Sequence, residues 1–347
     1  MAKRSKLTAN IAKPFAILRG RVKKFMSKRP HRSLRLTRRR DYVRPLNLPG
    51  HFSLTAHVGK TVWSYKKQLM PLTLVLLVLY IVLVGIGSQS TYSSLLDFLK
   101  EIGEDASVGE ISTLTQAGVV LMTISTVGFG SEVTEVQLVF SILIVVFGWL
   151  VTVWLLRNLL ANKKVNLRDG LYNAGAPLVS TLVIVLVFFI QLLPLSLAAV
   201  GFTAATNSGL IEGGVEAMLF WIAFLALTLI SVYWSVSSFF ALVIVTLPGT
   251  YPFKALSIAG DMMVGRRLKF VLRILWGFLL TVIAWAFILI VIILFDMWLK
   301  KIWAAIDWLP LVPFFVLVLT SFALVWLSSY IYLLYRKVVD EDAKNEN

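Results

Sequence analysis

The sequence contains no cysteine, and its three histidines, His31, His51 and His57, all precede the first long apolar run. The lack of cysteine excludes disulfides and thiolate-bound metals. The placement of the histidines excludes a histidine metal site or a Ser-His-Asp triad within the apolar part of the chain. We therefore expect no metal site and no hydrolytic triad there.

Charged residues are also scarce: 15% of the 347 residues are charged and 58% are hydrophobic. Soluble domains have about 25% charged and roughly 45–50% apolar residues, so this composition is typical of a protein that crosses a membrane several times. The charge is unevenly placed. Residues 1–67 hold 19 Lys and Arg and one acid, Asp41, whereas the rest holds 15 basic and 17 acidic residues. The net charge of +16 therefore comes from the N-terminal segment.

Six long apolar runs lack Asp, Glu, His, Lys and Arg in their middles; they are 69–87, 139–156, 177–200, 217–247, 274–295 and 310–334. About 20 apolar residues in a helix match a hydrocarbon layer of ~30 Å. The runs are continuous rather than alternating, which favours helices over a barrel. We predict an all-α integral membrane fold with six transmembrane helices. Without buried acids or bases we expect no enzyme, no cofactor and no proton-coupled transporter.

Basic residues collect at both ends and in the second and fourth connections, while the first and third connections are acidic. Because short basic loops stay in the cytoplasm, we predict that both termini are cytoplasmic. The fifth connection, with Lys300 and Lys301, fits this orientation less well. Four acids near span edges are expected to be solvated or to cap helices: Asp169, Asp261, Asp296 and Asp307.

The N-terminal segment, residues 1–50, is predicted to be a basic, disordered cytoplasmic tail without a signal-peptide core. It could contact anionic lipid, contact nucleic acid or a ribosome, or only set orientation. No nucleic-acid module or interleaved aromatics support the second role. The lipid bilayer and its anionic head groups are therefore the expected partners. Candidate contacts are Arg38, Arg39, Arg40, Arg266, Arg267 and Lys269.

Two amphipathic segments are predicted to form helices at the membrane surface. Residues 51–68 place Leu54, Val58, Val62 and Tyr65 near one helical face, with Ser53 as an N-cap. A second segment, Tyr251–Lys269, lies between the fourth and fifth spans. The six-span domain then covers 69–337, and 338–347 form a short cytoplasmic tail.

Few polar residues lie within the spans, and we expect them to form hydrogen bonds between helices, worth ~0.6 kcal/mol each. They are Gln191, Ser231, Ser235, Ser238, Ser321, Ser328 and Ser329. Pro194 predicts a kink in the third span. The fourth run, 217–247, is longer than one straight span, and we expect it to bend near Trp234–Ser238.

The connection between the first two spans contains a stretch rich in Gly, Ser and Thr, residues 111–135. Part of it resembles the selectivity filter of potassium channels, with the five filter positions at Thr126, Val127, Gly128, Phe129 and Gly130. The resemblance implies a ring of main-chain carbonyls around potassium ions, completed by four copies of the chain.

In that interpretation, Glu132 and Glu135 would attract cations to the outer mouth of the pore. The sequence departs from the family pattern, because Ser131 replaces the usual Asp and residues 117–120 lack the pore-helix aromatics. The alternative is a re-entrant or extracytoplasmic hairpin in which Gly, Ser and Thr form turns. The leading interpretation is a non-enzymatic scaffold or transport component, and the alternative is a potassium-selective, tetrameric channel.

A second resemblance covers more of the chain. The six-span layout, residues 171–177 and 240–248, and the Ala255–Arg267 segment resemble uncharacterised multi-pass bacterial proteins. They are also similar to the membrane domain of some glycerophosphodiester phosphodiesterases. The resemblance implies a bacterial plasma-membrane location and no particular chemistry.

Overall fold

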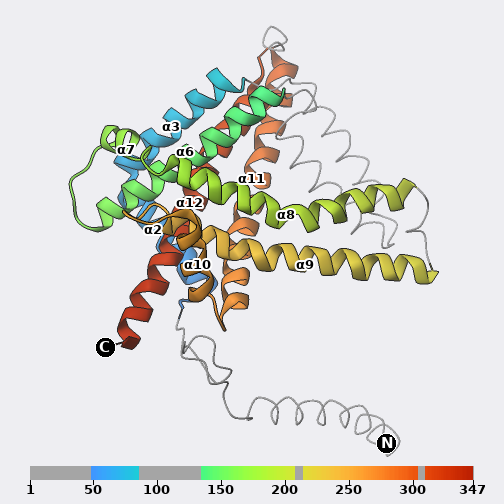
Figure 1. Cartoon of the computed structure of the whole chain (residues 1–347). Helices are drawn as coiled ribbons and strands as arrows, with labels where there is room; N and C mark the ends of the chain where they lie inside the picture. Colours follow the sequence, from blue (N-terminus) through green and yellow to red (C-terminus); the bar gives the residue numbers. More distant parts are fainter. Residues whose placement is uncertain (1–47, 86–133, 208–213, 304–308, 347) are drawn as a thin grey trace, which may run out of the picture.

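The computed structural model describes residues 48–85, 134–207, 214–303 and 309–346. This described part is all-helical (Figure 1). Its helices are α2 (His51–Ser64), α3 (Lys66–Leu83), α6 (Glu135–Leu160), α7 (Leu167–Asn173), α8 (Leu178–Asn207), α9 (Gly214–Ile244), α10 (Pro252–Met262), α11 (Arg267–Ile302) and α12 (Leu311–Glu346).

Six of these helices are long and apolar enough to cross a membrane: α3, α6, α8, α9, α11 and α12. They confirm the six predicted spans and identify a multi-pass membrane protein. Some of the helices extend beyond the predicted spans. Helices α11 and α12 each contain 36 residues, which is about 54 Å and more than the hydrocarbon layer requires. Their charged ends continue the helix because Lys, Arg and Glu are good helix formers.

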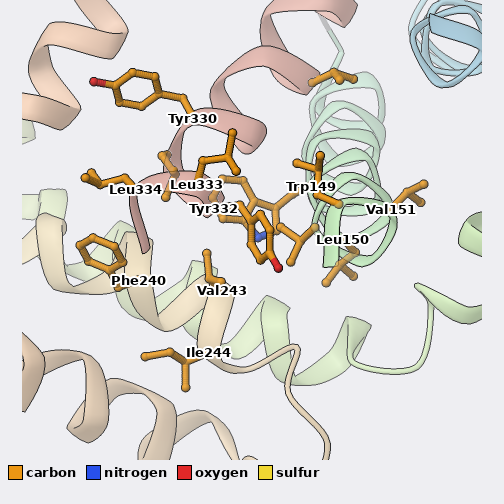
Figure 2. Close-up of a cluster of buried hydrophobic side chains, with 14 of the residues drawn as sticks. Trp149, Leu150, Val151, Phe240, Val243, Ile244, Tyr330, Tyr332, Leu333 and Leu334 are labelled. Atoms are coloured by element: carbon orange, nitrogen blue, oxygen red, sulfur yellow. The ribbon is translucent and has the colours of Figure 1, made fainter. Parts of the chain in front are cut away.

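Helix α12 is central to the packing, since it contacts α2, α3, α6, α9 and α11. Figure 2 shows Tyr332 and Leu333 of α12 between Trp149 and Leu150 of α6 on one side and Val243 of α9 on another. Lipid tails are as apolar as leucine, so such a core is stabilised by close packing rather than by exclusion of water. Gly148 of α6 permits this approach, because a Cβ there would lie 2.7 Å from the Leu324 side chain.

Helices α8 and α9 form a pair that extends away from the other helices, to the right in Figure 1, whereas α3, α6 and α11 reach the top. In their most apolar windows only 11% of the residues of α8 and of α9 are buried, against 56% for α6. The pair therefore packs mainly against itself and presents large apolar side chains outward. Helix α9 is uninterrupted through the expected bend at Trp234–Ser238.

Two hydrogen bonds join this pair. The Leu195 main-chain N–H, directly after Pro194, donates to Ser231 Oγ at 3.0 Å. The Ser238 hydroxyl donates to Gln191 Oε1 at 2.7 Å. The two bonds confirm the predicted contacts between helices for Gln191, Ser231 and Ser238. The prediction was wrong for the other serines, whose hydroxyls donate to carbonyls four residues earlier in their own helices: Ser235, Ser321, Ser328 and Ser329.

Helix α2 buries its predicted apolar face against other helices of the protein. Leu54, Val58 and Val62 are buried, and the helix contacts α11 and α12. Its start is fixed by Arg273 of α11, whose Nη2 donates to Pro49 O at 3.1 Å. Ser53 is not the N-cap, because the helix begins at His51 after Gly50. The predicted single segment 51–68 is divided at Tyr65, and α3 begins one residue later, at Lys66.

The acids at span edges behave differently from one another. Asp169 caps α7, since the Asn166 N–H donates to Asp169 Oδ2 at 2.9 Å. Asp261 is exposed, and Asp307 lies outside the described residues. The expectation of a solvated or capping role was wrong for Asp296, which is 4% exposed and pairs with Lys300 Nζ at 3.0 Å. A charged residue is therefore enclosed at the far end of α11.

Candidate functional site

The filter-like residues Thr126–Gly130 and Glu132 lie outside the described part of the chain, so their role stays a prediction. Glu135 is the first residue of α6, after the N-cap Thr134. The side chain of Gln137 donates to Val84 O at 2.7 Å, which joins the start of α6 to the end of α3. Within a single chain, 56% of the residues in the most apolar window of α6 are buried.

The predicted head-group contacts fall into three groups. Arg38, Arg39 and Arg40 lie outside the described residues. Arg266 is 3% exposed, and its Nη2 lies 2.8 Å from Asp342 Oδ2. That enclosed ion pair argues against the predicted contact between Arg266 and lipid. Arg267 lies over the Tyr233 ring at 4.4 Å, and Lys269 is exposed.

A cavity of about 470 Å³, here called the apolar groove, lies between α6, α8, α9, α11 and α12. Its lining includes Val145 and Trp149 of α6, Val185 and Phe188 of α8, and Phe239 of α9. Phe188 and Phe239 meet edge to face with 5.1 Å between ring centroids. These aromatic and aliphatic side chains suit an apolar ligand.

The three hydroxyls in the wall of the groove are already used. Ser141 donates to Gln137 O at 2.9 Å, Thr181 to Pro177 O at 2.8 Å, and Ser328 to Leu324 O at 2.6 Å. Each bond lies within its own helix or at that helix's start. The groove thus offers a ligand apolar contact and no strong hydrogen-bond donor.

A second cavity of about 430 Å³, here called the polar pocket, lies between the end of α6, the α7–α8 connection and the residues after α9. Its polar lining consists of Arg157, Asn173, Ser180, Thr246 and Thr250. Arg157 Nη1 donates to Thr246 O at 2.8 Å, and Nη2 donates to the Thr246 hydroxyl. Among the ion pairs in the described ranges, none includes Arg157.

The apolar groove and the polar pocket are lined by consecutive stretches of the same helices. On α6 the groove ends at Trp149 and the pocket begins at Leu150, and on α8 the pocket ends at Ser180 and the groove begins at Thr181. At this boundary Trp149 Nε1 donates to Leu242 O at 3.2 Å, which joins α6 to α9. Together they form a candidate site with an apolar part and a cationic part, suited to an amphipathic anion.

The sequence identified Arg157 only as the end of the second span. The other lining residues come from helices distant in the chain, so no local pattern marks them. The one local signal was a basic residue at a span end followed by a basic loop, Lys163, Lys164 and Arg168. No known protein family, curated protein or solved structure matches the chain.

Proposed function

We propose that this chain is a non-enzymatic protein of the bacterial plasma membrane, with both termini in the cytoplasm, that binds a lipid by its acyl chain. The observation that carries the proposal is the apolar groove. Its volume of about 470 Å³ lies within the roughly 300–1,000 Å³ of ligand sites in proteins. Its wall hydroxyls are bonded internally, so an acyl chain leaves no polar group without a partner.

The arrangement of helices supports this role. The α8–α9 pair extends away from the other helices (Figure 1), and the groove lies where it meets α6 and α12. The Gln191–Ser238 bond and the Phe188–Phe239 contact tie α8 to α9, so they form one wall. A lipid held there fits a transport component or a membrane scaffold.

A weaker second proposal is a potassium-selective channel formed by four copies. It is favoured by the packing of α3 against α6 and by the Gln137–Val84 bond that closes the pair. The burial of α6 within one chain argues against it. Potassium flux into liposomes that is lost in Gly128→Ala would support the channel, and no flux from folded protein would contradict it.

The lipid proposal is tested by filling the groove. Val145 lines the groove and is 41% exposed, whereas Val139, on the same helix and 54% exposed, does not line it. Val145→Trp should reduce labelling by a phospholipid with a photoreactive acyl chain by about tenfold, while Val139→Trp should leave labelling unchanged. Labelled peptides should come from α6, α8 and α9.

Equal labelling of wild type and Val145→Trp, with both proteins monodisperse, would overturn the proposal. Labelling spread evenly over all six spans would do the same, because bulk lipid contacts every outward face.

A further inference from the structure

We infer that the polar pocket binds the phosphate group of the lipid whose acyl chain lies in the apolar groove. This inference rests on the proposed function, and it adds the chemistry of the head group. It assigns Arg157 as the principal phosphate contact, with Asn173 and Ser180 as neutral partners.

Arg157 has N–H donors that its protein partners do not use. A guanidinium carries five N–H donors in a planar fork that matches phosphate oxygens. Thr246 accepts two hydrogen bonds from it, one at its carbonyl and one at its hydroxyl. The guanidinium therefore keeps further N–H groups for an outside acceptor, and a bidentate phosphate contact uses two of them.

The charge of Arg157 favours an anion. Its partners are neutral oxygens, and no carboxylate in the described ranges pairs with it. The carbonyl ends of α6 and α9 supply a partial negative charge only, since a helix terminus corresponds to roughly half a charge. A phosphate would neutralise the guanidinium, which is partly buried within the protein, where an uncompensated charge is costly.

The other lining residues suit the same ligand. Ser180 lies in the first turn of α8 and Asn173 at the end of α7, and both line the pocket with hydroxyl and amide groups. A helix start favours negative charge as a secondary contribution. The pocket thus combines one cation with neutral polar groups, one level along the helices from the apolar groove.

The position of the pocket fits a phospholipid. Arg157 lies in the last turn of α6, before the exposed Lys163, Lys164 and Arg168. If α6 crosses the membrane, this end lies at the head-group level, and the groove leads from it toward the hydrocarbon. A phospholipid of that leaflet would place its phosphate in the pocket and one acyl chain in the groove.

The test compares two lipids with identical acyl chains, phosphatidylglycerol and diacylglycerol, bound to the full-length protein and measured by native mass spectrometry. Wild type should retain the phosphate lipid about tenfold better. Ser180→Phe fills the pocket without removing a cation, and Ser196→Phe, on the exposed side of the same helix, is its control. Arg157→Gln removes the cation, and Arg168→Gln, in the exposed basic loop, is its control.

We expect Ser180→Phe and Arg157→Gln to lose the preference for phosphate while still binding diacylglycerol, and both controls to keep it. Equal binding of the two lipids by wild type, with binding still sensitive to Val145→Trp, would overturn the phosphate assignment and leave the proposed function intact. If neither lipid binds, the proposed function falls. Ser180→Phe decides the question should Arg157→Gln fail to fold.

Inorganic phosphate, tested without lipid, distinguishes a phospholipid from a soluble phosphate as the ligand of the polar pocket. Thermal stabilisation by inorganic phosphate that depends on Arg157, without any preference between the lipids, would assign the pocket to a soluble phosphate and overturn the lipid source. Stabilisation by phosphatidylglycerol but not by inorganic phosphate supports the lipid.

Discussion

At the scale of single residues, Gly277 shows how tightly α11 meets α12. A Cβ at this position would lie 2.8 Å from the Tyr330 ring. The Tyr330 hydroxyl donates to Arg273 O at 3.0 Å, and the side chain of Arg273 holds Pro49 O before α2. The lack of a side chain at Gly277 thus permits a set of contacts that connects α2, α11 and α12.

Gly277→Val should therefore destabilise the protein by about 1–3 kcal/mol, the usual cost of overpacking a core. Gly201→Val on α8 is the control, because a Cβ there would meet only Phe220, at an ordinary 3.8 Å. The measurement is the midpoint of thermal unfolding in detergent, followed by size-exclusion chromatography. Equal midpoints for the two variants would contradict this account of Gly277.

At the scale of helices, α8 is joined to α9 where Pro194 interrupts its regular hydrogen bonding. Proline removes one donor and crowds the preceding turn, and Ser231 of α9 accepts the next N–H, that of Leu195. Ser231 is fully buried, so its hydroxyl has no water as an alternative partner. The pairing of the two helices therefore depends on a proline in one and a serine in the other.

Ser231→Ala should cost about 0.6–1.7 kcal/mol, the range for hydrogen bonds between membrane helices. In a Pro194→Ala background the same change should cost much less, because Leu195 N–H can then donate within a regular helix. Ser237→Ala is the control, since the Ser237 hydroxyl is exposed and donates to Trp234 O of its own helix. Additive effects in the unfolding midpoints would contradict the coupling.

The helices illustrate what sequence could and could not predict. Apolar runs located all six spans, and the kink expected at Pro194 stays a prediction, since α8 continues through it. Ser231, which accepts from the N–H after Pro194, lies 36 residues away, and nothing near it in sequence indicates the contact. Asp296 was misjudged because its place at a span edge suggested solvent. Its pairing with Lys300 is a local contact four residues along the same helix, but its burial depends on how α11 packs.

At the scale of the whole molecule, the candidate site follows the same pattern. The groove and pocket arise where α8 and α9 diverge from α6 and α12, and that angle is set by tertiary packing. Val145, Val185 and Phe239 each read as ordinary apolar positions of a span. The cavity forms only because the fold brings these residues together. Sequence patterns therefore predicted the membrane class but not the site.

The predicted topology can be tested with single introduced cysteines, because the sequence has no cysteine of its own. Single cysteines at Lys164 and Lys254, both exposed, should react with an impermeant thiol reagent from the cytoplasmic side only. A cysteine at Glu135, exposed at the start of α6, should react from the opposite side only. Labelling of all three from one side would contradict six crossings.

The central place of α12 has a consequence for synthesis in the cell. This helix leaves the ribosome after the other described helices, yet it contacts α2, α3, α6, α9 and α11. Helices made earlier must therefore stay in the membrane without their main packing partner until α12 has been made. A chain truncated before α12 would insert its earlier helices but leave them exposed to the proteases that remove unassembled membrane proteins.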